Sequence, residues 1–190
     1  MLIAGFPSPV TDTNCWVLAP AHGEQCVIVD PGIGIGRWLD EVVADSRLHP
    51  VAVLLTHGHI DHTFSVLPVC QARDVPAYIH PDDRGQLTDP WSGLGMSAGT
   101  PLLGLERLTL AEPDDLRLLC DGDTLLSGDV LFAGSIGRVD LPGGSLADMT
   151  ASLRHVILPL PDETVVHPGH GPSTTIGRER VTNPYLLDLL

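Results

Sequence analysis

A run of five apolar residues that leads directly into a cluster of histidines is the feature that most restricts how this chain folds. Residues 51–55 read Val-Ala-Val-Leu-Leu, and residues 57–62 read His-Gly-His-Ile-Asp-His. A continuous apolar run of this length is typical of a strand that is buried on both faces. The cluster therefore falls on a loop at the end of a buried strand, where the sheet holds the side chains rigidly and the loop lets them face a ligand.

The same arrangement recurs along the chain, because Asp30, Asp129 and His170 each follow another short apolar run. Strands are expected at residues 2–5, 14–19, 26–30, 51–55, 77–79, 123–127 and 164–166. Helices are expected at residues 35–47 (through Trp38, Leu39, Val42 and Val43), 64–72, 145–155, 175–180 and 184–190. Residues 81–115, with many Gly and Pro, are expected to be a flexible segment that covers the surface. The pattern predicts an α+β fold in one domain spanning residues 1–190.

Charge and hydropathy argue against several classes of partner. The chain has 10 basic and 24 acidic residues and a formal charge of −14, which repels nucleic-acid phosphates and anionic membrane surfaces. No apolar run approaches the roughly 20 residues of a membrane-spanning helix, and the first residues lack the basic region of a signal peptide. Four widely spaced cysteines are best explained as buried thiols. A cytoplasmic location is therefore expected.

Three histidines and one aspartate within six residues form a set of metal ligands. Imidazole nitrogens and a carboxylate suit Zn²⁺, and also iron or manganese. On a loop, His57 and His59 can point to the same side, while Asp61 and His62 serve a second point in space. Gly58 is expected to leave room for the backbone close to the metal. A bound divalent ion would lower the pKa of its water toward about 7, which makes hydroxide available near neutral pH.

Residues 56–62, Thr-His-Gly-His-Ile-Asp-His, resemble the T-H-x-H-x-D-H signature of the metallo-β-lactamase superfamily. Further segments resemble that family in the expected order: residues 13–15, 29–32, 127–132, 134–144, 168–172 and 174–177, followed by Glu179 and Asn183-Pro184. The likeness runs along nearly the whole chain. It is nearest to the small glyoxalase II-like hydrolases, which resemble hydroxyacylglutathione hydrolases.

The resemblance implies an αββα sandwich with a pair of metals, zinc by expectation and iron or manganese as alternatives. In that picture His57 and His59 hold the first metal, and Asp129 bridges the two. The second metal is held by Asp61, His62 and His170, and Asp61 is also expected to be catalytic. Hydroxide supplied by the metals would attack a thioester, ester or amide carbonyl.

Two further residues have open roles. Asp30 is expected to hydrogen-bond turn amides or a ligand histidine. Arg138 is expected either to orient the substrate or to pair with Asp140.

The chain departs from the family where a further first-metal histidine is expected, some twenty residues before Asp129. No histidine lies between His80 and His155. About thirty residues, roughly two strands and a ligand loop, are missing by comparison with the family pattern. Three explanations remain open: an internal deletion, a sequence that omits residues of a longer chain, or substitution of the ligand by His80 or Cys120. A deletion would weaken the first metal site and expose sheet edges that favour a homodimer.

The leading prediction of function is hydrolysis of a small-molecule thioester or related acyl substrate, which segment 134–144 and the residues after 174 favour. One alternative is a catalytically impaired metal-binding protein of the same fold, because of the missing histidine. Another is a β-lactam or lactone hydrolase.

Overall fold

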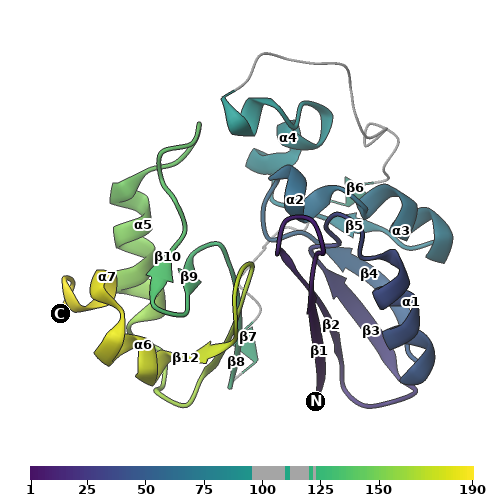
Figure 1. The fold of residues 1–190 in the computed structure, drawn as a ribbon, viewed down its shortest axis with the longest axis horizontal. Helices are drawn as coiled ribbons and strands as arrows, with labels where there is room; N and C mark the ends of the chain where they lie inside the picture. Colours follow the sequence, from purple (N-terminus) through teal and green to yellow (C-terminus); the bar gives the residue numbers. More distant parts are fainter. Residues whose placement is uncertain (96–109, 112–119, 122) are drawn as a thin grey trace. The chain divides into compact units, whose positions relative to one another are not determined.

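The computed structural model describes residues 1–95, 110–111, 120–121 and 123–190. The chain divides into two compact units, residues 1–116 and residues 117–190 (Figure 1). Each unit has a hydrophobic core of its own. That residues 1–190 act as a single domain stays a prediction. Within the described residues, no helix is long and apolar enough to cross a membrane.

The first unit is built on a mixed sheet whose strands follow one another in chain order. They are β1 (Leu2–Pro7), β2 (Asn14–Ala19), β3 (Gln25–Val29), β4 (His49–Leu54), β5 (Ala77–Tyr78) and β6 (Leu110–Ala111). The strands β1, β2 and β3 pair antiparallel, whereas β3 to β6 pair parallel. The predicted strands are therefore confirmed here, with small shifts of their ends.

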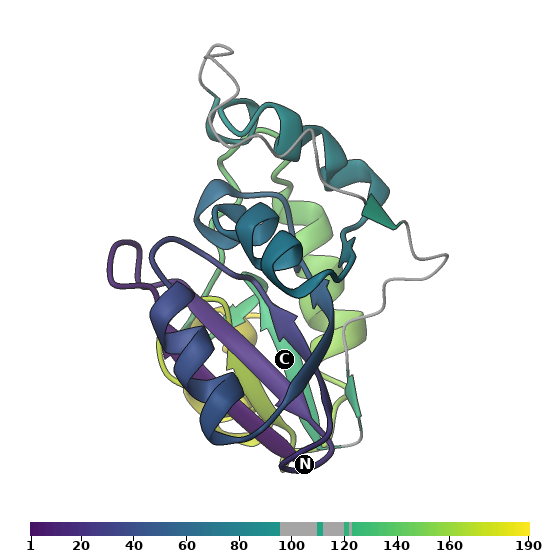
Figure 2. The ribbon, with the colours of Figure 1, turned by 90° about the vertical axis from the view of Figure 1, so that its right-hand side faces the viewer.

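Helices join the parallel strands of the first unit. Helix α1 (Gly36–Asp45) connects β3 to β4, and the short α2 (Ile60–Thr63) and α3 (Val66–Arg73) connect β4 to β5. Connections between neighbouring parallel strands are almost always right-handed, so helices that join strands added in one direction lie on one face of the sheet. Both views show α1 and α3 on the same side of the sheet (Figures 1 and 2). The hydrophobic core of this unit packs between the sheet and these helices. Its largest fully buried side chains are Ile28, Ile35, Leu39, Leu55 and Ile79. Trp38, predicted to lie on the apolar face of its helix, is instead 49% exposed, beneath the guanidinium of Arg37.

The prediction of an irregular segment over residues 81–115 is wrong for its first part. Residues 81–94 contain the 3₁₀ turn η1 (Pro81–Asp83), helix α4 (Arg84–Thr88) and the 3₁₀ turn η2 (Ser92–Leu94). The turn begins at Pro81, and the His80 side chain accepts a hydrogen bond from the Asp82 amide at 3.3 Å. Leu87 anchors α4 in the core. Residues 96–109 and 112–115 lie outside the described residues.

The second unit contains a sheet in the order β12 (Thr174–Thr175), β11 (Val165–Pro168), β8 (Thr124–Gly128) and β7 (Cys120–Asp121), and a hairpin of β9 (Leu131–Phe132) and β10 (Ser135–Ile136). Strands β8 and β11 are parallel. Helix α5 (Leu146–Ser152) runs into a π-helical turn (Leu153–Ile157), and α6 (Ile176–Thr182) and α7 (Pro184–Leu187) follow β12. Ser145 caps α5 by accepting a hydrogen bond from the Asp148 amide. The core consists of Leu125, Leu131, Leu153, Ile157, Val166, Ile176 and Leu186.

Candidate metal centre

In the first unit, the ends of two neighbouring parallel strands bring Asp30 and the loop 56–62 together. Asp30 follows β3 and the loop follows β4, and the Asp30 amide donates to the Leu54 carbonyl at 3.0 Å. Asp30 has a left-handed backbone (φ 49°), which Asp adopts more readily than most residues. A Cβ added to Gly32 would lie 2.3 Å from the Asp61 carbonyl oxygen, so a glycine is required where the turn touches the loop.

Asp30 is a buried carboxylate, 1% exposed, that organises the loop through three hydrogen bonds. Its Oδ1 accepts from the Thr56 amide at 2.8 Å, and its Oδ2 accepts from the Thr56 hydroxyl at 2.6 Å. The same Oδ2 lies 2.8 Å from Nδ1 of His62. Because an ionised carboxylate only accepts, Nδ1 of His62 carries the proton, and the neutral ring presents the lone pair of Nε2. Asp30 thus contacts the predicted ligand histidine and the backbone amide at the start of the loop 56–62.

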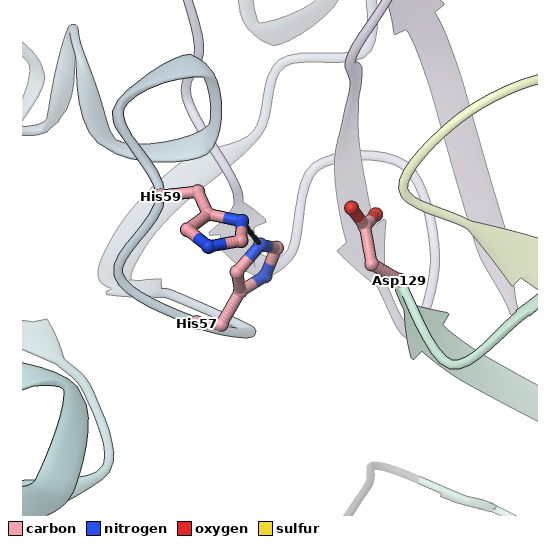
Figure 3. Close-up of side chains that lie close together, drawn as sticks. All are labelled: His57, His59 and Asp129. Carbon is pink, nitrogen blue, oxygen red and sulfur yellow. Dashed lines mark hydrogen bonds between the residues drawn. The ribbon is translucent and has the colours of Figure 1, made fainter. Parts of the chain in front are cut away.

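The side chains of His57 and His59 form one pair, called here the His57/His59 pair. The hydroxyl of Thr56 donates to Asp30, so it accepts from Nδ1 of His57, at 3.0 Å. His57 then presents the lone pair of Nε2, which lies 2.8 Å from Nδ1 of His59 (Figure 3). Two imidazole nitrogens that converge in this way suit a shared divalent ion.

Asp61 and His62 form the second pair, called here the Asp61/His62 pair. Their backbone enters the single turn of α2, and Nε2 of His62 lies 3.5 Å from Oδ2 of Asp61. The Thr13 hydroxyl donates to that oxygen at 2.8 Å, from a residue 48 positions earlier in the chain. His62 is fully buried, whereas the Asp61 carboxylate is 25% exposed. A carboxylate oxygen and an imidazole nitrogen therefore converge at the second point.

Gly58 has a different role from the predicted one. A Cβ at this position would lie 2.7 Å from Cβ of Gln86 and 2.8 Å from the Asp83 carbonyl oxygen. Gly58 therefore makes room for the segment around α4. Burial raises the pKa of the Asp83 carboxyl there.

In the second unit, the parallel strands β8 and β11 bring Asp129 and His170 to the same edge. The Gly169 amide donates to the Gly128 carbonyl at 2.8 Å, and Oδ2 of Asp129 lies 3.8 Å from Nε2 of His170. A Cβ added to Gly137 would lie 1.8 Å from the Asp129 carbonyl oxygen. Only glycine allows this close approach of the β10 end to Asp129.

Glu179 connects the β9–β10 hairpin to the C-terminal helices. Its buried carboxylate accepts hydrogen bonds from the Gly134 amide (2.7 Å), the Thr174 hydroxyl (2.6 Å) and the Asn183 side-chain amide (2.9 Å). The Asn183 amide also donates to the Ser135 carbonyl at 3.0 Å. This network fixes the hairpin whose end carries Gly137. The sequence contained both residues within the family-like segment, but it gave no sign of their contacts.

Arg138 pairs with Asp140 through two hydrogen bonds, of 2.8 and 2.7 Å, and both side chains are exposed. The Arg138 hydrogen bonds lower the pKa of the Asp140 carboxyl to about 2. Pairing, one of the two predicted roles of Arg138, is what the structure records.

The two residues considered as substitutes for the missing histidine gain no support. Among the described residues, two groups of converging donors could hold a metal; His57 and His59 belong to one, and Asp61 and His62 to the other, but His80 belongs to neither. His80 lies beside the Asp82 carboxylate, at 3.6 Å. The side chain of Cys120 lies outside the described residues.

The donors of the first unit fit a divalent metal of the zinc or iron type. Three imidazoles and one carboxylate are ligands that these ions accept, and the contacts of Asp30 and Thr56 fix two of the imidazole tautomers for coordination. The described cysteines do not take part, since Cys15, Cys26 and Cys70 are buried in the core. Desolvation raises the pKa of each thiol, that of Cys70 to about 11.

Comparison with known proteins decides the family. The model of the metallo-β-lactamase superfamily matches residues 8–119, more than half of the chain. The chain belongs to the metallo-β-lactamase superfamily. It also matches a probable metallo-hydrolase of Bacillus subtilis, YqgX, with 34% identity over 86% of this chain and 88% of the relative. This membership identifies the chain as a metallo-hydrolase homologue in a superfamily that binds divalent metals.

Two solved metallo-β-lactamase-fold structures resemble the chain over almost its full length. One is described as the B3 metallo-β-lactamase BLEG-1, with 35% identity, a TM-score of 0.77, and 97% of this chain and 99% of the other covered. The other is TTHA1623 in a di-iron-bound form, with 33% identity, a TM-score of 0.78, and coverage of 98% and 100%. The α+β sandwich predicted from the sequence is confirmed.

Two further relatives each align with 98% of the chain, in alignments longer than the chain itself. An uncharacterised protein of Mycobacterium leprae is 42% identical over 215 positions, which cover 98% of this chain and 99% of the relative. The hydroxyacylglutathione hydrolase GloC of Haemophilus influenzae is 29% identical over 212 positions, with 98% of each covered. Ninety-eight per cent of 190 residues is about 186, so about 29 of the 215 positions face gaps in this chain.

Proposed function

We propose that the chain is a metal-dependent thioester hydrolase that acts on a small acylated thiol. The observation that carries the proposal is the Asp30 network, which sets the tautomers of His57 and His62 for metal binding. The choice of a thioester is supported by the 29% identity to a hydroxyacylglutathione hydrolase and by the family-like segment 134–144.

In this proposal, Asp129 and His170 also act as metal ligands, which are the roles that the family-like segments 127–132 and 168–172 suggest. Zinc is the proposed metal, with iron as the alternative suggested by the di-iron-bound relative. When bound, the metals supply hydroxide near neutral pH and stabilise the oxyanion.

The chain's own residues orient these ligands. Asp30 holds the Nδ1 proton of His62 and, through the Thr56 hydroxyl, fixes the ring of His57. Thr13 donates to Oδ2 of Asp61, which keeps this carboxylate directed toward Nε2 of His62. We propose Asp61 as the catalytic residue as well as a ligand. Arg138 is proposed to stay with Asp140 or to contact the substrate at its exposed end.

The test is thioester hydrolysis by the zinc-loaded chain, with His59→Ala as the matched variant. Turnover by the wild-type chain that the substitution abolishes is the expected result. Metal binding with no turnover in either protein would replace the proposal by the alternative of a catalytically impaired metal-binding protein.

A second candidate substrate is a β-lactam or lactone, because one similar structure is described as a B3 metallo-β-lactamase at 35% identity. The rate at which the same zinc-loaded preparation hydrolyses a chromogenic cephalosporin, compared with its rate on the thioester, distinguishes the two substrate classes. Faster hydrolysis of the β-lactam than of the thioester would favour this candidate.

The surroundings of the enzyme are also proposed from its charge. A formal charge of −14 favours small-molecule substrates over nucleic acid or anionic membranes and suits a cytoplasmic location. A homodimer is proposed because an internal deletion of strands would expose sheet edges, which pair readily with a second copy. Sedimentation of the purified chain tests the dimer.

A further inference from the structure

We propose that this chain binds one divalent metal tightly, through the Asp61/His62 pair, and a second one only weakly, through the His57/His59 pair. The inference rests on the proposed metal-dependent function and concerns how the two positions fill. Two observations support it. The hydrogen bonds that hold the two pairs differ in charge, and the chain has different numbers of ligands available for each pair.

The hydrogen bonds behind the two pairs differ in charge. His62 donates from Nδ1 directly to the Asp30 carboxylate, at 2.8 Å, and is fully buried. A hydrogen bond to an ionised acceptor is about twice as strong as a neutral one, and a carboxylate behind an imidazole raises its basicity toward a metal. His57 donates instead to the neutral hydroxyl of Thr56, at 3.0 Å. The negative charge of Asp30 therefore acts on His62 directly and on His57 only through an intervening hydroxyl.

The pairs also differ in their other member and in their exposure. Asp61 brings a negative charge to the position that it shares with His62, and the Thr13 hydroxyl fixes its Oδ2. His59 brings a neutral ring, and both members of the His57/His59 pair are half-buried. Attraction between a cation and a carboxylate is stronger than between a cation and a neutral nitrogen. The Asp61/His62 pair is the better site on both counts.

The number of available ligands points in the same direction. Zinc sites generally use at least three protein ligands, and the superfamily pattern supplies the His57/His59 position with a third histidine. The chain has no histidine between His80 and His155, and about 29 positions of its alignment to the Mycobacterium leprae relative face gaps. His22, His49 and His155 are exposed on other segments, His80 is bound to its own turn, and His167 contacts Ser173. The His57/His59 position therefore lacks the third histidine of the superfamily pattern.

This difference makes the metal content a function of metal concentration. At low free zinc the chain carries one ion, held through the Asp61/His62 pair. The second ion binds only when free zinc rises, so any activity that needs both ions is switched on by metal supply. The chain would thus act as a hydrolase whose turnover is limited by metal availability.

The experiment strips the full chain with a chelator, reloads it with Zn²⁺, and titrates it against a chromophoric zinc chelator. We expect elemental analysis after gel filtration to find one retained equivalent. A second equivalent should bind about 10- to 100-fold more weakly, the size of effect that ligand support has on metal affinity. Two equivalents retained with similar affinity, or none retained, would overturn the inference.

Matched variants assign the tight ion. His62→Ala should reduce the retained zinc to less than one tenth of an equivalent, whereas His57→Ala should leave one equivalent bound. The reverse pattern contradicts the inference. If the buried His62→Ala variant does not fold by circular dichroism, Asp61→Asn, at a partly exposed position, provides the same comparison.

The outcomes are independent of the hydrolysis assay. A chain that hydrolyses thioesters but retains two equivalents overturns the inference and leaves the proposed function intact. A chain that retains one equivalent of zinc but shows no turnover at saturating zinc supports the inference and contradicts the proposed function.

Discussion

The two units position their candidate ligands by different means. In the first unit, the candidate ligands are positioned by hydrogen bonds to other side chains. These bonds pair Asp30 with His62, Thr56 with His57, and Thr13 with Asp61. In the second unit, the backbone does most of this, through the contact of Gly137 with Asp129 and the bond between Gly169 and Gly128. The unit with charged and hydroxyl support is the one that carries the histidine cluster.

This difference separates two kinds of sensitivity. Side-chain support sets the tautomer and basicity of a ligand, so its loss should change metal affinity more than folding. Backbone support sets the path of the chain, so its loss should change folding first. The comparison is supported if substitutions in the first unit mainly lower metal affinity and substitutions in the second unit mainly lower stability. The opposite pattern would contradict it.

The largest effect is expected from Gly137→Ala, in the backbone-supported unit. The new Cβ would lie 1.8 Å from the Asp129 carbonyl oxygen, so the backbone has to move. Overpacking of this kind costs about 3 kcal/mol. Urea unfolding measures the loss, with Gly36→Ala as control, because a Cβ at Gly36 meets nothing within 4 Å. Equal stabilities of the two variants would show that the approach of Gly137 to Asp129 is not a constraint.

The next effect is expected from Asp30→Asn, in the unit supported by side chains. An amide placed against Nδ1 of His62 would move the ring proton to Nε2, which then no longer coordinates. Zinc affinity should fall about 10- to 100-fold, with folding retained because Asn tolerates the left-handed backbone at this position. Competition with a chelator measures the affinity. Asp74→Asn is the control, since Asp74 has the same backbone conformation (φ 52°) at the end of α3; a similar loss in both variants would exclude the tautomer mechanism.

A smaller effect is expected from Thr56→Val, which removes the hydroxyl between Asp30 and His57. The second, weaker zinc equivalent should bind about 10-fold more weakly, and the tight one should change little. Thr56→Ser keeps the hydroxyl and should behave as wild type. If serine and valine variants have the same zinc titration, the hydroxyl does not position His57.

The smallest effect is expected from Arg138→Ala, at the exposed ion pair of the second unit. The pKa of Asp140 should rise from about 2 toward its ordinary value of 3.8. Since the folded pKa is lowered, the pair is present above the ordinary pKa and is lost as the pH falls through about 2. Carboxyl NMR titration follows this change, and zinc binding should be unaltered. A drop in zinc affinity would instead indicate that Arg138 supports the metal centre.

Much of the fold could be predicted from the sequence, because buried strands leave continuous apolar runs. The candidate ligands of the loop 57–62 were recognisable for the same reason, since they directly follow such a run. The helical turns at residues 81–94 were not, because they begin at Pro81 and a capping histidine in a stretch rich in turn-forming residues. The prediction for Trp38 was wrong because helical spacing alone does not show which residues at the border of the apolar helix face are exposed to water.

The contacts that support the ligands were mostly beyond prediction, since they join distant residues. Thr13 reaches Asp61 across 48 positions, and Glu179 reaches Gly134 across 45. Asp30 was the exception: a carboxylate just before Pro31-Gly32 already indicated contacts with turn amides or a ligand histidine. Those contacts depend on which strand ends are neighbours, which the fold alone provides.

X-ray absorption at the zinc edge of the chain loaded with one equivalent tests whether imidazole and carboxylate groups, His62 and Asp61 among them, hold the metal. A first shell of nitrogen and oxygen at about 2.0–2.1 Å with outer-shell scattering from imidazole is expected. A sulfur scatterer at about 2.3 Å, or a shell without imidazole scattering, would contradict it.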